Sequence, residues 1–141
     1  MKIGKHLIIA LGELGQEEIP GDEDNPRISE YLATVNLGSD DEIPWCAAFV
    51  NWCLEQSGVK GTKRPNAKSY LNWGYHIGDP MPGCVCVFQR GDKGWQGHVG
   101  FYLDSDKYSI YLLGGNQSDK VCIRKYSIDR FISARWSPEF E

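Results

Sequence analysis

The sequence predicts an α+β domain in which N-terminal helices pack on an antiparallel sheet of five to six strands. Two observations support this prediction. The first half of the chain has helical hydrophobic periodicity with helix start and stop signals, and the second half has short runs that alternate with a period of two. The length of 141 residues suits one ordinary domain. We therefore expect a single domain over residues 1–141, with a core large enough to fold without disulfides.

The first helices are predicted on either side of an acidic loop. The opening residues, MKIGKHLIIALGELG, favour an amphipathic helix, and the following QEEIPGDEDNP is typical of an exposed loop. Pro26 suits the first turn of a second, short helix, and Gly38 is its expected stop. These two helices cover the start of the domain.

The third predicted helix is apolar on most of its sides. It lies in the segment IPWCAAFVNWCLEQSG and should end at Gly58, a residue that favours a left-handed cap. A helix without a polar face is expected at the centre of a fold. A further short helix is predicted over residues 67–73.

The second half of the chain reads as five short strands joined by tight turns. The runs with β-strand alternation are GCVCVFQR, HVGFYLDS, SIYLLGGN, VCIRKYS and FISARW. The turn signals between them include RGDKG, DSDK and NQSDK. This spacing predicts a meander or a small half-barrel.

Composition argues against several classes of partner. The net charge of −4, from 15 basic and 19 acidic residues, disfavours nucleic acid, which draws on a basic face. No apolar run approaches the length of a bilayer span, so no membrane partner is expected. The apolar residues 7–11 are too few for a signal core, which predicts a protein made in the cytoplasm without a signal peptide. The five cysteines are an odd number, which favours a reactive thiol over a disulfide framework.

Cys46 is the candidate nucleophile because it stands at the opening of the buried helix. Free backbone N–H groups and the positive end of the helix dipole stabilise a thiolate at such a position. Cys53, in the middle of the same helix, is expected only to pack in the core.

His98 is the candidate base because it begins a strand after the glycine-containing loop GDKGWQG. A thiol nucleophile requires a group that takes its proton. The other two histidines are weaker candidates: His6 is expected on the surface of the first helix, and His76 is expected to be structural or to face substrate.

Asn116 is the candidate partner for the second ring nitrogen of His98. If HVGFYLDS and SIYLLGGN form a hairpin, Asn116 returns to the end of the sheet where His98 lies. Gln117 and Asp119 are the alternatives. The segment GGNQSD is also compatible with an ordinary turn that has no role in catalysis.

No metal or other cofactor is expected. Cys84, Cys86, Cys122 and His76 could approach one another, but no CxxC or histidine pair has zinc-ligand spacing. The chain also lacks the glycine-rich motifs of nucleotide-binding sites.

The motifs IPWCAAFVNWCLEQSG, PMPGCVCVF, GHVGFYL and LLGGNQSD together resemble the NlpC-type and CHAP superfamily of papain-like cysteine amidohydrolases and peptidases. The resemblance extends over about residues 18–136. It implies a papain-like fold and a peptidoglycan substrate, cut as an N-acetylmuramoyl-L-alanine amidase or as an endopeptidase.

The resemblance implies a Cys46, His98 and Asn116 triad, with Trp45 as the aromatic residue before the nucleophile. Trp45, Trp73 and Gln117 are the expected substrate-binding residues of the groove. Where the commoner form of the motif reads PGD, this chain has Gly83 followed by Cys84, which leaves Cys84 without an assigned role.

The expected setting is a monomeric enzyme that reaches the cell wall in the periplasm by release or injection, as a phage endolysin or as a secreted antibacterial effector. In the effector case an immunity protein should cover the Cys46 groove. Two alternatives stay open: a non-catalytic wall-binding or phage structural module, and a cysteine protease that acts on a protein substrate.

Overall fold

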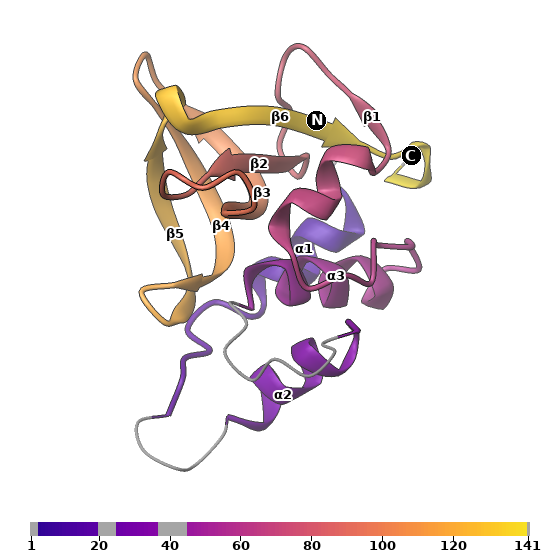
Figure 1. Ribbon diagram of the computed structural model, residues 1–141. Coiled ribbons are helices and arrows are strands. Elements are labelled where there is room, and N and C mark those ends of the chain that lie inside the picture. The colour runs from indigo at the N-terminus through magenta and orange to yellow at the C-terminus, as the bar shows by residue number, and fades with distance from the viewer. Residues whose placement is uncertain (1–2, 20–24, 37–44, 141) are drawn as a thin grey trace.

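A computed structural model describes residues 3–19, 25–36 and 45–140, and it has the expected α+β architecture. Three α-helices lie on one face of a six-stranded antiparallel sheet (Figure 1). The helices are α1 (Lys5–Leu11), α2 (Pro26–Ala33) and α3 (Cys46–Gln56), with short 3-10 helices η1 (Ala67–Asn72), η2 (Ile128–Arg130) and η3 (Pro138–Phe140). The strands are β1 (Tyr75–His76), β2 (Val85–Gln89), β3 (Gly97–Ser105), β4 (Ser109–Gln117), β5 (Lys120–Ser127) and β6 (Phe131–Trp136).

The sheet is a meander that is extended on one side by its last strand. Strands β2 to β5 pair with their neighbours in sequence, and β6 returns to pair with the free side of β2, which gives the order β1-β6-β2-β3-β4-β5. All five predicted strands are confirmed. The two-residue strand β1 was not predicted, because a pair of exposed residues carries no alternation signal.

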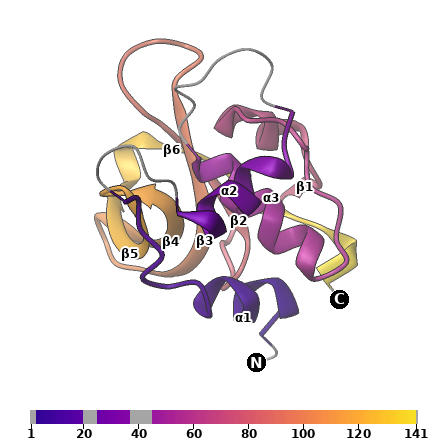
Figure 2. The ribbon, with the colours of Figure 1, turned by 90° about the horizontal axis from the view of Figure 1, so that it is seen from below.

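Helix α3 lies between the sheet and α2, with α1 beside it (Figures 1 and 2). Every residue from 46 to 54 is buried, which confirms the prediction of a central helix. Gly58 follows the helix with a φ of 83°, the left-handed conformation expected at its end. The main hydrophobic core fills the space between the helices and the sheet.

The short helices differ from the predictions in length or type. The helix expected over residues 67–73 is the 3-10 helix η1 (Ala67–Asn72). Helix α2 begins at Pro26 as expected, where the side chain of Asn25 accepts a hydrogen bond from the backbone N–H of Arg27. The helix ends at Ala33, and the predicted stop Gly38 lies outside the described residues.

In the described parts of the chain, no helix has the length and apolar character needed to cross a membrane.

His6 is buried, which corrects the expectation of a surface residue. Only 1% of it is exposed, because its ring stacks on Phe140 at 3.8 Å between centroids. Its Nε2 hydrogen bonds to the carbonyl oxygen of Gly83 at 2.7 Å. The amphipathic pattern of the first helix assigned this position to the wrong face, because the C-terminal residues that cover it are distant in sequence.

Candidate active site

Cys46 is the first residue of α3, as its motif predicted. Trp45 precedes the helix, and its side chain does not cap the first backbone N–H groups of α3. Only 2% of Cys46 is exposed. Its thiol therefore lies in a buried position at the positive end of a helix dipole.

His98 is the second residue of β3 and lies opposite Phe88 of β2. Its imidazole lies close enough to the Cys46 thiol for each group to act on the pKa of the other. One face of the imidazole packs on Tyr126 of β5, with ring centroids 5.0 Å apart. The structure thus brings together the two residues that the sequence proposed as nucleophile and base.

The two side chains shift each other's pKa. Burial alone raises the pKa of Cys46, but the charge and hydrogen bond of His98, with a backbone hydrogen bond from Val99, bring it below its usual value. Burial also lowers the pKa of His98, yet the Cys46 thiolate and the bond to Gln117 raise it above its usual value. Both shifts favour a thiolate and imidazolium pair.

Gln117, not Asn116, is the hydrogen-bond partner of His98. The Nε2 of His98 lies 2.8 Å from Oε1 of Gln117. The amide nitrogen of Gln117 donates to the carbonyl oxygens of Leu112 and Cys122, at 3.3 and 2.8 Å. This leaves the amide oxygen, which can only accept, facing the imidazole, so Nε2 carries the hydrogen. The Nδ1 atom is then free to take the proton of Cys46.

A bulge in β4 explains why the neighbouring residue was predicted instead. Asn116 has a φ of 57°, and the register between β4 and β5 shifts between Gly114 and Gln117. Successive strand residues point to opposite faces, so one inserted residue moves the next side chain to the other face. Gln117 therefore takes the face that regular alternation assigns to Asn116.

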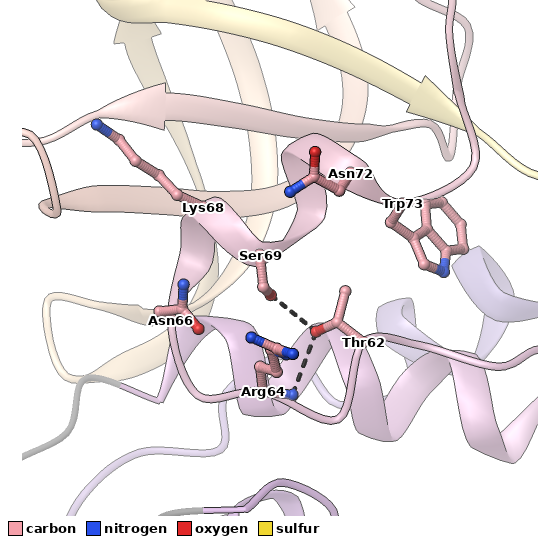
Figure 3. Close-up of a pocket in the computed structure, with 7 residues that line it drawn as sticks. All are labelled: Thr62, Arg64, Asn66, Lys68, Ser69, Asn72 and Trp73. Carbon is pink, nitrogen blue, oxygen red and sulfur yellow. Dashed lines mark hydrogen bonds between the residues drawn. The ribbon is translucent and has the colours of Figure 1, made fainter.

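The three expected substrate-binding residues do not share one groove. Trp45 is buried, and its indole N–H donates to Glu18 at 2.6 Å. Trp73 lines a separate cavity of about 430 Å³ near η1, together with Thr62, Ser69 and others (Figure 3). Its indole N–H donates to the carbonyl oxygen of Lys60 at 2.8 Å. Gln117 is 2% exposed, and its amide bonds to His98 and to two carbonyls, which leaves it little to offer a substrate.

A cavity of about 230 Å³ opens beside the imidazole and the amide. It is lined by residues of β2, β3, β4, β5, η2 and the turns between strands. They are Phe88, Gln89, Arg90, His98, Asn116, Gln117, Ser118, Arg124, Tyr126, Ser127 and Arg130. Sequence reasoning placed Asn116 and Gln117 here but missed the arginines, which are distant in sequence and belong to no motif.

Cys84 and Cys86 lie away from the helices, in a second hydrophobic cluster on the other face of the sheet. Their sulfur atoms are 3.8 Å apart and both residues are buried. Within residues 3–19, 25–36 and 45–140, no three histidine, cysteine or acidic side chains are grouped to hold a metal ion.

Comparison with known proteins identifies a family and finds distant likeness among solved structures. No curated protein matches the sequence. Among solved structures, a protein described as similar to a lipoprotein of the NLP/P60 family, from Staphylococcus aureus subsp. aureus Mu50, is 16% identical with a TM-score of 0.46. The alignment covers 84% of this chain and 44% of that chain, and at this distance it supports no conclusion about activity. The model of the CHAP domain matches residues 38–116, more than half of the chain, so this protein belongs to the CHAP domain family.

Proposed function

We propose that the protein is a cysteine hydrolase that cuts an amide or peptide bond of peptidoglycan. Cys46 is the nucleophile, His98 is the base and then the acid, and Gln117 positions His98. Membership of the CHAP domain family, and the resemblance of the Cys46 and His98 motifs to papain-like amidohydrolases and peptidases, support this proposal. The observation that carries the proposal is the placement of Cys46 at the start of α3 beside His98, with Gln117 Oε1 at 2.8 Å from Nε2 of His98.

The proposed reaction begins with attack of the Cys46 thiolate on the carbonyl carbon of the scissile bond. The carbon–sulfur bond forms while the carbonyl electron pair moves to oxygen, and the backbone N–H of Cys46 is one donor for this oxyanion. When the intermediate collapses, the carbon–nitrogen bond breaks and the His98 imidazolium gives its proton to the leaving amine. A thioester remains on Cys46.

Hydrolysis of the thioester completes the cycle. Neutral His98 takes a proton from water, and the resulting hydroxide attacks the thioester carbon. The carbon–sulfur bond then breaks, which releases the new carboxyl group and restores the thiolate and imidazolium pair. Throughout, the bond from Nε2–H to Gln117 keeps Nδ1 as the atom that exchanges protons.

The first test uses purified sacculi, the wild-type protein and three variants. We expect Cys46→Ala and His98→Ala to reduce release of soluble fragments to the background rate, because each removes a reacting group. His76→Ala is the matched control, since His76 is an exposed histidine that bonds to Ser133 and not to Cys46. Mass spectrometry of the fragments identifies the bond that is cut.

Two outcomes would contradict the proposal. If the wild-type protein releases no more than Cys46→Ala, wall hydrolysis is wrong and a wall-binding module becomes the better interpretation. If His98→Ala keeps the wild-type rate, His98 is not the base.

A further inference from the structure

Three arginines border the cavity beside His98 and come from three different segments. Arg90 follows β2, Arg124 lies in β5, and Arg130 ends η2. They border the same cavity although β2 and β5 are separated by two strands in the sheet order. The fold of the sheet therefore brings them together. This convergence distinguishes them from a run of basic residues along one exposed strand.

Two of the guanidinium groups are held by single hydrogen bonds at the rim of the cavity. Nη1 of Arg130 donates a hydrogen bond to the carbonyl oxygen of Gly91, at 2.9 Å between the two atoms. Arg124 donates through Nη1 to the hydroxyl of Ser118. A guanidinium has five N–H donors, so most of the donor capacity of Arg124 and Arg130 stays available.

No carboxylate of the described residues neutralises this group of charges. The ion pairs found over residues 3–19, 25–36 and 45–140 involve Arg27 and Lys63. The lining of the cavity includes three arginines and no acidic residue, although the chain as a whole carries a net charge of −4. The cavity is therefore locally opposite in charge to the protein around it.

The size and lining of the cavity favour a small anionic group over a polymer backbone. About 230 Å³ holds a side group of a few heavy atoms, and Phe88 and Tyr126 provide apolar walls beside the arginines. Guanidinium groups bind carboxylates with paired, parallel hydrogen bonds. His98 and Gln117 line the same cavity, so a group bound there lies beside the proposed base and its amide partner.

We propose that Arg90, Arg124 and Arg130 form a subsite for a free carboxylate of the substrate, next to the bond that is cut. This inference rests on the proposed function and specifies it further: the enzyme prefers wall peptides whose carboxyl groups are free over those in which they are amidated. The charge of Arg90 also lowers the pKa of both Cys46 and His98.

The test measures binding separately from cleavage. Soluble wall peptides with free carboxyl groups, and the same peptides amidated with carbodiimide and ammonium, are titrated into the Cys46→Ala variant by calorimetry. We expect the free form to bind roughly tenfold or more tightly, because a hydrogen bond between charged groups is lost on amidation. The same preference should appear as a lower KM when the wild-type enzyme cleaves the two substrates.

Arg124→Gln, made in the Cys46→Ala background for binding and in the wild type for kinetics, should remove most of the preference. Lys125→Gln is its matched control, because the neighbouring residue of β5 carries the same charge but does not line the cavity. Sacculi stripped of phosphate polymers with hydrofluoric acid form a further arm, in which the preference for free carboxylates should persist.

Several outcomes would overturn the inference. One is equal binding of free and amidated peptides, and another is an equal effect of Arg124→Gln and Lys125→Gln. A preference that disappears with the phosphate polymers would assign the subsite to phosphate instead. The proposed function fails on different data, namely the absence of Cys46-dependent release from unmodified sacculi, and the binding measurement still decides the subsite in that case.

Discussion

His98 must accept a proton, donate it and keep its orientation while it does so. The amide of Gln117 meets this requirement because its nitrogen is fixed by two backbone carbonyls, so its oxygen cannot turn away from Nε2. An amide oxygen accepts the Nε2 hydrogen in both the neutral and the charged imidazole. At the scale of single residues, Gln117 thus selects the tautomer that leaves Nδ1 for the thiol.

Substitution of Gln117 should therefore change the rate and the pH profile together. In Gln117→Leu we expect kcat to fall on the order of 10–100-fold, a part of the factor that a positioned base contributes. The bond to Gln117 also raises the pKa of His98. The alkaline limb of activity, where the imidazolium is lost, should accordingly move to lower pH. The measurement is the pH dependence of kcat/KM.

Asn116→Gly is the comparison for this variant, because glycine keeps the left-handed backbone that Asn116 adopts with a φ of 57°. We expect its loss of activity to be smaller than that of Gln117→Leu, with the alkaline limb unmoved. If the order of the two losses is reversed, Asn116 is the partner of His98 during the reaction.

At the scale of elements, the bulge of β4 and the glycines beside it control what reaches His98. A Cβ atom on Gly114 would collide with Oε1 of Gln117 and approach Nε2 of His98 to 3.5 Å. A Cβ atom on Gly115 would instead lie 2.7 Å from Cβ of Phe49 and 2.8 Å from the indole of Trp45. The two neighbouring glycines thus face the candidate site and the α3 core, respectively.

Alanine at these two positions should separate activity from stability. Gly114→Ala is expected to displace the amide of Gln117 and lower kcat, with the alkaline limb shifted as in Gln117→Leu. Gly115→Ala is expected to reduce the free energy of unfolding by about 1–3 kcal/mol, because Phe49 and Trp45 are packed in the core. Denaturant unfolding and kcat on the same preparations check both. Unchanged activity in Gly114→Ala would contradict the role of Gln117.

How far the sequence predicts the site depends on how local each signal is. Cys46 and His98 were identified because a helix start and a strand start are marked by neighbouring residues. The prediction for the partner of His98 was one residue away from the observed Gln117. Strand alternation can be read from the sequence, but the bulge at Asn116 cannot. Trp73 lies in another cavity, because its chain neighbours do not indicate which face of the molecule it joins.

At the scale of the whole molecule, elements from both ends of the chain meet at His6. Helix α1 presents its imidazole to Gly83, just before β2, and to Phe140 in η3. The ring also packs on Phe101 of β3, with centroids 5.4 Å apart. These contacts join the N-terminal helix to the sheet and to the C-terminal segment, and they hold the imidazole in a buried position that disfavours its charged form.

Burial lowers the pKa of His6 below its ordinary value of 6.5, although the bond to Gly83 partly opposes the shift. As pH falls below about 6.5, the unfolded chain takes up a proton at this position before the folded protein does. Folding stability should therefore decrease from about pH 6.5 towards the folded-state pKa of His6. His98 has a raised pKa and acts in the opposite direction, because the stability it contributes is lost as pH rises.

His6→Gln keeps a donor for the carbonyl of Gly83 but does not titrate in this range, so its stability should decline less between pH 7 and 5 than that of the wild type. The measurement is the urea midpoint at several pH values in this interval, above most of the range in which ordinary carboxylates titrate. His76→Gln, which replaces the exposed histidine of β1, should follow the wild-type curve. If His6→Gln loses stability as steeply as the wild type, the acid sensitivity arises elsewhere and the link between the chain ends does not depend on the charge of His6.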